Sequence, residues 1–220
     1  MDSSGPTVVT ATIEDLVVRA TDLAARAPRT ILAIVGAPGA GKSTVCSALD
    51  DALGERAVVV GMDGFHLANE VLVALGRRQR KGAPDTFDVR GYVALLARLR
   101  QADEDVTYAP RFDRGLEESI GSAVPVARTV PLVITEGNYL LHDAGGWQDV
   151  RPLLDEVWFI DVPAAERVRR LVERRMSCGD NAEQARSWVT DVDEANASVV
   201  HAGRGRANLV VHLVEVESPA

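Results

Sequence analysis

The 220-residue chain is poor in several features, and each scarcity narrows the class of protein. It has only two cysteines, Cys46 and Cys178, without a CxxC pair or a metal-ligand spacing. A disulfide framework is therefore not expected, and a reduced, cytoplasmic protein is predicted. No apolar stretch approaches the ~18 residues that a membrane span requires. The first residues lack the basic and apolar segments of a signal peptide, so none is expected.

Positive charge is also scarce. Lys and Arg number 24 against 32 Asp and Glu, which gives a formal net charge of -8. A strongly acidic protein binds nucleic acid and anionic membranes poorly. The predicted partner is a small molecule, with neither nucleic acid nor membrane. The sequence leaves the oligomeric state open, a homodimer being one alternative.

Short apolar runs punctuate the chain and predict its fold. Hydrophobic residues make up 46% of it, enough for a single domain over residues 1–220. Strands are predicted at five runs, residues 30–36, 57–63, 130–137, 156–161 and 208–214. Runs that are apolar throughout are typical of a parallel sheet covered by helices on both faces. The fold class is therefore a doubly wound α/β domain.

Three further segments are assigned by pattern and length. Apolar residues at helical spacing predict an amphipathic helix over residues 10–28, with a capping box from Thr12 and Asp15. Residues 64–129 are too long for one crossover between strands. They are expected to form a helical and loop insertion that holds a substrate. Residues 164–205 are expected to form a lid and the C-terminal helices.

A glycine-rich motif lies between the first predicted strand and the helix after it. Residues 36–43 match G-x-x-x-x-G-K-[ST] in full. Such a loop points backbone N–H groups at phosphate oxygens, and the helix N-terminus adds partial positive charge. Lys42 is predicted to contact the β- and γ-phosphates, and Ser43 to bind Mg²⁺. The expected nucleotide-binding residues of the loop are Gly36, Ala37, Pro38, Gly39, Ala40, Gly41, Lys42, Ser43 and Thr44.

Several classes of protein use such a loop. The chain has no Asn-Lys-x-Asp motif of a GTPase and no Ser-Gly-Gly-Gln signature of a transport ATPase. A kinase that phosphorylates small molecules fits the remaining motifs. Two alternatives stay open: a regulatory P-loop ATPase without a small-molecule acceptor, and a degenerate member that only binds nucleotide.

Carboxylates follow three of the predicted strands. Ligands of open α/β sheets lie at the carboxyl ends of the strands. Asp63 could there accept the proton of an acceptor hydroxyl, or it could cap a helix near Leu67. Glu136 and Asp161 compete for the metal-side role. Glu136 is preferred, because Asp161 precedes a proline and a helix and suits an N-terminal cap.

Two groups of basic residues stand out in this acidic chain. Arg167, Arg170 and Arg174 share one face of a predicted helix, where they could close over the nucleotide and stabilise charge during transfer. Arg170 is the predicted catalytic member of the row. The alternative is a solvated helix face paired with Glu166 and Glu173. A second basic run, residues 77–81, either guides an anionic ligand or is a solvated loop.

Taken together, the motifs resemble a known family. The stretches "GAPGAGKST", "GMDGFHL", "RKGAPDTFD", "YAPRFDR" and "VITEGNYLL" are similar, in this order, to the P-loop kinases related to uridine kinase, bacterial-type pantothenate kinase and phosphoribulokinase. The resemblance implies a three-layer α/β/α fold with a five-stranded parallel sheet, ATP with Mg²⁺, and phosphorylation of an alcohol. It also implies that Asp63 is the base, that Glu136 is the acidic residue after the third strand, and that the arginine row lies in the lid.

The expected acceptor is a pantothenate-, nucleoside- or sugar-like metabolite. Its candidate binding residues are His66, Asp88, Arg111 and Asp113, although His66 could be a turn residue and Asp88 a helix cap. The sequence departs from the uridine kinase pattern after Phe112-Asp113. Arg114 comes next, and Glu117 stands where those kinases have a histidine.

Overall fold

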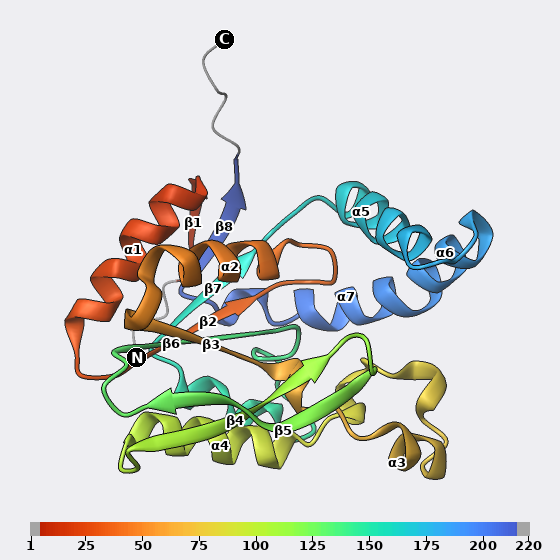
Figure 1. The fold of residues 1–220 in the computed structure, drawn as a ribbon. Helices are drawn as coiled ribbons and strands as arrows, with labels where there is room; N and C mark the ends of the chain where they lie inside the picture. Colours follow the sequence, from red (N-terminus) through yellow and green to blue (C-terminus); the bar gives the residue numbers. More distant parts are fainter. Residues whose placement is uncertain (1–4, 215–220) are drawn as a thin grey trace.

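The computed structural model describes residues 5–214, in which a six-stranded parallel sheet forms the centre (Figure 1). Its strand order is β1-β8-β7-β2-β6-β3. The strands are β1 (Thr7–Ala11), β2 (Thr30–Val35), β3 (Ala57–Gly61), β6 (Leu132–Gly137), β7 (Glu156–Ile160) and β8 (Leu209–Leu213). The five predicted strands are all present. The expected count of five is wrong by one, because β1 adds an edge strand.

Helices cover both faces of the sheet, as its apolar strands require. They are α1 (Ile13–Arg26), α2 (Lys42–Leu53), α3 (Asn69–Ala74), α4 (Val89–Gln101), α5 (Ala164–Ser177), α6 (Ala182–Trp188) and α7 (Glu194–His201). Helices α1 and α2 bury Leu16, Leu23 and Leu49 on one face. Helices α4 and α7 bury Leu96 and Val200 on the other face. Each such aliphatic side chain contributes about 1.5–3 kcal/mol when fully buried.

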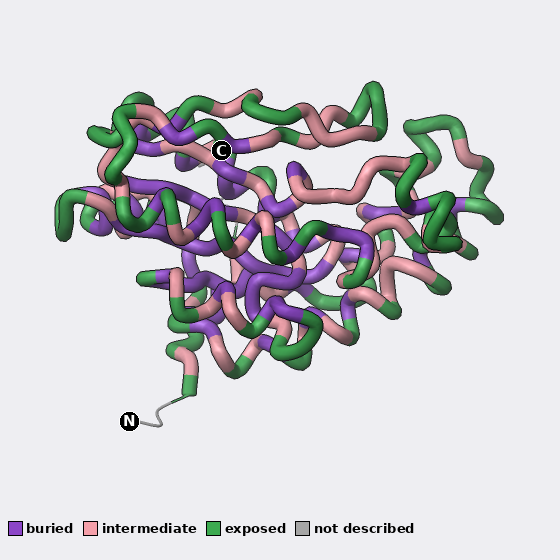
Figure 2. The backbone as a smooth tube through the Cα atoms, turned by 90° about the horizontal axis from the view of Figure 1, so that it is seen from below, coloured by how far each residue is buried: buried purple, intermediate pink, exposed green. Residues whose placement is uncertain are grey.

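Buried residues run through the central strands β2, β6 and β7, whereas exposed ones lie mainly on the outer helices, the loops and the edge strand β1 (Figure 2). The capping box predicted for the first helix is present at Thr12 and Asp15. That helix begins at Ile13, however, because residues 7–11 are used by β1.

Residues 64–129 contain more than helices and loops. After α3 and α4, strands β4 (Val106–Asp113) and β5 (Glu118–Ala127) pair as an antiparallel hairpin outside the main sheet. The hairpin packs on the turn Met62–Phe65 that follows β3. Pro110 lies so close to Gly64 that a Cβ there would meet the Pro110 oxygen at 2.6 Å. The carboxyl ends of β3 and β6 therefore face this hairpin on one side and α5 on the other (Figure 1).

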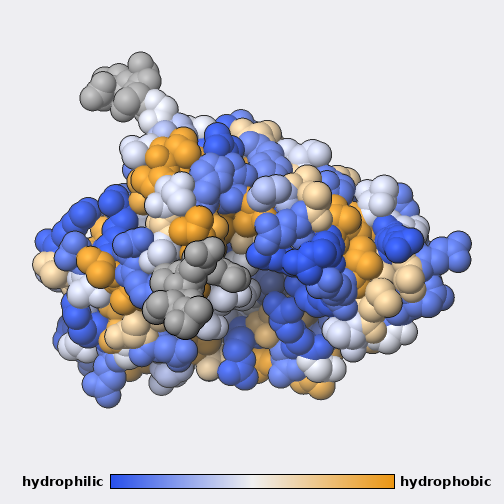
Figure 3. Space-filling model, turned by 90° about the horizontal axis from the view of Figure 1, so that it is seen from above, coloured by the Kyte–Doolittle hydropathy of each residue, from blue (hydrophilic) through white to orange (hydrophobic). Residues whose placement is uncertain are grey.

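Within residues 5–214, no helix is both long and apolar enough to cross a membrane. From above, the hydrophobic side chains form separate groups among hydrophilic ones, and strongly hydrophilic side chains gather where arginine-rich α5 lies (Figure 3).

Candidate active site

The phosphate loop joins the end of β2 to the start of α2. Gly39 and Gly41 have φ angles of 79° and 89°, in the left-handed region that side chains rarely adopt. A Cβ at Gly39 would also meet the backbone oxygen of Arg167 at 2.9 Å. Helix α2 has no side-chain cap at its N-terminus. Its first N–H groups are therefore available to an anion.

The side chains of the loop have different surroundings. Ser43 and Thr44 are exposed, and neither hydroxyl is hydrogen-bonded within the described chain, so both are available to a ligand. The remaining residues of the predicted set shape the loop through their backbone. Gly36, Ala37 and Ala40 are buried, and Pro38 is partly buried.

Lys42 is buried beside the loop. Its Nζ donates hydrogen bonds to the backbone oxygens of Gly36 at 2.8 Å and Ala37 at 3.3 Å, and to Asn138 Oδ1 at 2.7 Å. Burial lowers the pKa of Lys42, whereas the carboxylates of Glu136 and Asp63 raise it. The ammonium group thus lies between the phosphate loop and the two acidic residues that follow the neighbouring strands.

Glu136 and Asp63 are brought together by the sheet register, in which Glu136 on β6 pairs with Gly61 on β3. Burial raises the pKa of Glu136, and the charge of Asp63 raises it further, while Lys42 and Arg114 lower it. Asp63 lies in the turn Met62–Phe65, and its carboxylate accepts no hydrogen bond from the described residues. It does not cap a helix, since α3 begins only at Asn69 without a side-chain cap.

Asp161 has a different environment. It follows β7, and its Oδ2 accepts a hydrogen bond from Arg204 Nε at 3.1 Å and lies 3.1 Å from Nη2 of the same guanidinium. The residue before α5 is Pro163, which provides no side-chain cap. The expectation that Asp161 caps this helix is therefore wrong. Of the two competing carboxylates, only Glu136 lies beside Lys42.

The residues at the loop suit a divalent cation that arrives with a nucleotide. Within residues 5–214, no three His, Cys, Asp or Glu side chains converge as a metal site of their own. A magnesium ion here would therefore need oxygens from phosphate and water in addition to the protein. The Ser43 hydroxyl and the Glu136 carboxylate could hold it. Two mutually repelling carboxylates, one of them largely buried, form an environment that a cation stabilises.

The three arginines of the predicted row have separate roles in the structure. Arg167 is 2% exposed, and its Nη1 donates to the Pro38 oxygen at 3.2 Å and lies 3.0 Å from Glu194 Oε1. Arg170 pairs with Glu166, and its Nη1 lies 3.6 Å from where a Cβ of Gly41 would be. Arg174 is exposed and forms no ion pair in the described chain, and its charge acts on Lys42. Arg170 thus lies beside the loop and Arg174 acts on Lys42 through its charge alone, whereas Arg167 is buried between the loop and α7.

The acceptor candidates do not converge on one place. His66 lies beside Asp63, with Nδ1 at 2.8 Å from the Asp63 backbone oxygen. Asp88 caps α4 through Gly91 N and lines a cavity of about 540 Å³ with Arg77, Arg90 and His142. The other two candidates lie on the hairpin. Asp113 accepts hydrogen bonds from Gly115 N and Leu116 N in its turn, and Arg111 is exposed on β4.

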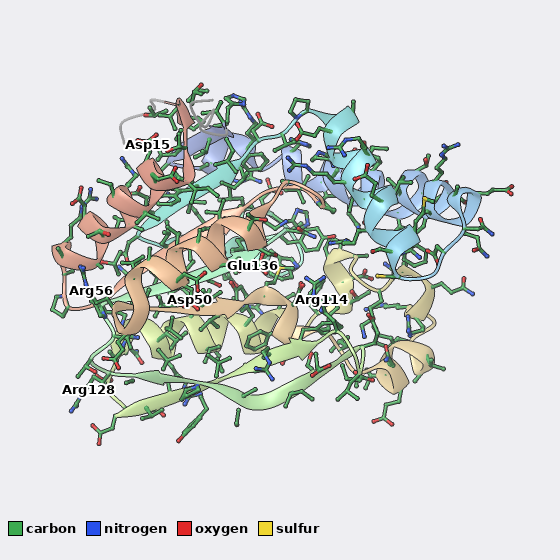
Figure 4. All side chains as sticks on the ribbon, turned by 45° about the horizontal axis from the view of Figure 1, so that its top comes forward. Asp15, Asp50, Arg56, Arg114, Arg128 and Glu136 are labelled. Atoms are coloured by element: carbon green, nitrogen blue, oxygen red, sulfur yellow. The ribbon has the colours of Figure 1, made fainter. Side chains whose placement is uncertain are left out.

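Two residues near the loop and Asp63, Asn138 and Arg114, were not among the predicted site residues, and Lys81 was named only as part of the basic run at residues 77–81. Asn138 contacts Lys42, Lys81 contacts the hairpin, and Arg114 acts electrostatically on Glu136. Figure 4 labels Arg114 and Glu136, which lie in the region between α2 and the hairpin turn. The basic run at residues 77–81 was a signal for Lys81. Nothing local distinguished the other two.

No family model matches the chain. Individual proteins do. An uncharacterised protein of Escherichia coli, YggC, is 35% identical over 192 residues, which span 85% of this chain and 79% of YggC. A uridine kinase of Chlamydia pneumoniae is 25% identical over 185 residues, 83% of this chain and 81% of that enzyme.

The fold has a similar solved structure. A protein of Silicibacter sp. TM1040, assigned as a fructose transport system kinase, is 38% identical to this chain. The two superpose with a TM-score of 0.82, and the match covers 91% of this chain and 98% of that one.

Proposed function

We propose that the chain phosphorylates a hydroxyl group of a small metabolite, because it belongs to the P-loop kinases related to uridine kinase. These kinases are ATP-dependent phosphotransferases that use Mg²⁺ and a hydroxyl acceptor. Asp63 takes the proton of the attacking hydroxyl. Lys42, Arg170 and Arg174 stabilise the charge of the phosphates, and Ser43 and Glu136 hold the metal ion.

The position of Asp63 is the observation that supports this proposal most. It follows β3 at the carboxyl edge of the sheet, beside the phosphate loop, and it also begins the insertion that would hold an acceptor. Its carboxylate is not used by a helix cap, and its charge acts on both Lys42 and Glu136. A regulatory ATPase without an acceptor would have no use for a base on the insertion side.

Replacing Asp63 by Asn tests the proposal. The amide keeps the size of the side chain but cannot accept the proton. ADP release in the presence of an acceptor should fall on the order of 10²–10⁴-fold. Calorimetric binding of a non-hydrolysable ATP analogue should stay close to the wild-type value. Asp50→Asn, a matched change at an exposed site on α2 (Figure 4), should alter neither quantity.

The acceptor is sought by measuring ADP release over nucleosides, pantothenate, sugars, sugar phosphates and small hydroxy acids. Turnover well above the acceptor-free background with one class supports the kinase. If ADP release were unaffected by every compound and appeared only with a protein partner, the regulatory ATPase would replace it. Equal losses of ATP binding and turnover in Asp63→Asn would move Asp63 to the nucleotide or metal site.

A further inference from the structure

The surroundings of His66 determine which hydrogen bond this side chain of the insertion can form with an acceptor. The imidazole packs between Phe87 and Phe112, with ring centres 4.1 Å and 4.8 Å away. Its Nδ1 lies 2.8 Å from the Asp63 backbone oxygen. A carbonyl oxygen can only accept, so Nδ1 carries the proton. Burial lowers the pKa of His66 and favours the neutral ring. Nε2 is then an acceptor, and it forms no hydrogen bond within the described chain.

Lys81 lies on the same aromatic ring. Its ammonium nitrogen is 5.0 Å from the centre of Phe112 and donates to Asn69 Oδ1 at 2.8 Å and to the Glu117 backbone oxygen at 2.5 Å. An ammonium group has three N–H donors, so one is left over. The neighbouring Glu118 carboxylate already accepts from Asn69 N at 2.9 Å. Burial lowers the pKa of Lys81 and the charges of Glu118 and Glu117 raise it, but neither carboxylate forms an ion pair with Lys81 among the described residues.

Arg114 adds a second positive charge on this side. It lies in the hairpin turn, where the hydrogen bonds from Gly115 N and Leu116 N to Asp113 fix the backbone. Its guanidinium forms neither an ion pair nor a hydrogen bond within residues 5–214, while its charge acts on Glu136. Most other arginines of this acidic chain are paired. Two cations that form no ion pair within residues 5–214 thus lie on this side of the site: Lys81, whose charge acts on His66, and Arg114, whose charge acts on Glu136.

The aromatic rings around His66 are not available for stacking. Phe87, Tyr139 and Trp147 are buried and pack edge-on or tilted against each other. Phe112 contacts His66 and Lys81. Proteins that read a nucleobase outside a duplex commonly stack it on an aromatic face. In the described chain this region offers no such face.

We propose that the acceptor is an aliphatic hydroxy compound that carries an anionic group, a carboxylate or a phosphate, and is not a nucleoside. Lys81 and Arg114 bind the anion, and His66 Nε2 accepts a hydrogen bond from a hydroxyl group. In this proposal the second basic run of the sequence, residues 77–81, binds an anionic ligand through Lys81. This inference rests on the proposed kinase activity and names the substrate class of the same site.

The test compares acceptors with and without an anionic group. ADP release is measured with D-glycerate against glycerol, pantothenate against pantothenyl alcohol, and sugar phosphates against their parent sugars, with uridine and cytidine alongside. The anionic member of at least one pair should be the better substrate. Which pair responds distinguishes a carboxylate from a phosphate.

Variants then link the preference to the two cations. Lys81→Met and Arg114→Gln should each lower kcat/KM for the anionic acceptor roughly ten- to a hundredfold, the usual effect of losing a hydrogen bond to a charged group. The KM for ATP should not change. Lys81→Arg should retain most of the activity, which excludes misfolding as the cause. Arg128→Gln is the matched control. Arg128 lies at the opposite end of the hairpin from Arg114 (Figure 4), where it pairs with the exposed Asp105.

A nucleoside or an uncharged sugar as the best substrate would overturn the inference and leave the kinase intact. So would equal losses in Lys81→Met, Arg114→Gln and Arg128→Gln. If no compound raised ADP release above the acceptor-free background, the proposed function would fail, and this inference with it.

Discussion

At the scale of single residues, charge balance around Lys42 explains the chemistry that the loop can support. Its ammonium group faces two carboxylates, Glu136 and Asp63, and is itself largely desolvated. The two carboxylates carry more negative charge than Lys42 can balance. A divalent cation can neutralise this net negative charge. The two carboxylates differ in position, since Glu136 lies within the sheet and Asp63 lies on the turn toward the insertion.

A metal titration tests the position assigned to Glu136. Glu136→Gln removes one negative charge from the metal site, so a higher Mg²⁺ concentration should be needed for half-maximal ADP release. Asp161→Asn is the matched control, because its carboxylate is bound to Arg204 away from Lys42. Its Mg²⁺ requirement should equal that of the wild type. A shift in Asp161→Asn alone would assign the metal-side role to Asp161.

At the scale of elements, α5 is attached to the phosphate loop by a buried side chain. Arg167 joins the Pro38 carbonyl to Glu194 on α7, and the backbone of Arg167 touches Gly39. The Nε of Arg167 is buried without an acceptor. The row of three arginines is therefore divided: Arg167 holds the helix on the loop, Arg170 lies beside Gly41, and Arg174 is exposed.

Removing Arg167 should destabilise the protein. Breaking a buried ion pair costs about 3–5 kcal/mol, and Arg167→Ala should fall near the lower end because the Glu194 side chain is 35% exposed. Arg169→Ala, which breaks an exposed pair with Glu173 on the same helix, should cost less than about 1 kcal/mol. Urea denaturation of both variants measures the difference. Similar losses would contradict the attachment of α5 through Arg167.

The elements also show what local sequence can and cannot predict. The runs at β2, β6 and β7 are predictable because burial on both faces makes their sequences almost entirely apolar. Strand β1 was missed because Thr7–Ala11 is short and largely exposed, and only pairing with β8 makes it a strand. The hairpin was missed because Pro110 and Pro125 interrupt its strands, which normally argues against a strand.

Within the site, too, some residues can be predicted from local sequence and others cannot. Lys42 and Ser43 belong to a contiguous motif whose backbone geometry is local, and Asp63 and Glu136 follow from strand ends. Lys81 stood only in a basic run that could equally be a solvated loop, and Glu194 had no local signal. Lys81 becomes relevant only when the hairpin folds onto Asn69, and Glu194 only when α7 packs beside α5. Contacts between distant segments of the chain decide these positions.

At the scale of the whole molecule, nucleotide binding should stabilise the fold. A ligand that binds only the folded state adds about 2.7 kcal/mol at a concentration of 100 Kd. The melting temperature of the wild type should therefore rise with ATP and Mg²⁺. Lys42→Met keeps the apolar stem and removes the charge, so this rise should be lost or greatly reduced, together with phosphoryl transfer. An undiminished rise in Lys42→Met would contradict the assignment of the loop.

The strand order also constrains how the chain can fold during synthesis. Strand β8 lies between β1 and β7, with Thr7 opposite Leu209 and Trp158 opposite Leu209 on its other side. The earliest strand of the sheet thus has no neighbour until the latest one has left the ribosome. Residues 7–11 therefore cannot pair into the sheet while β2, β3, β6 and β7 assemble. A chain stopped before residue 209 would leave Thr7–Ala11 unpaired and the Trp158 edge of the sheet open to the chaperones or neighbouring chains that bind exposed strands.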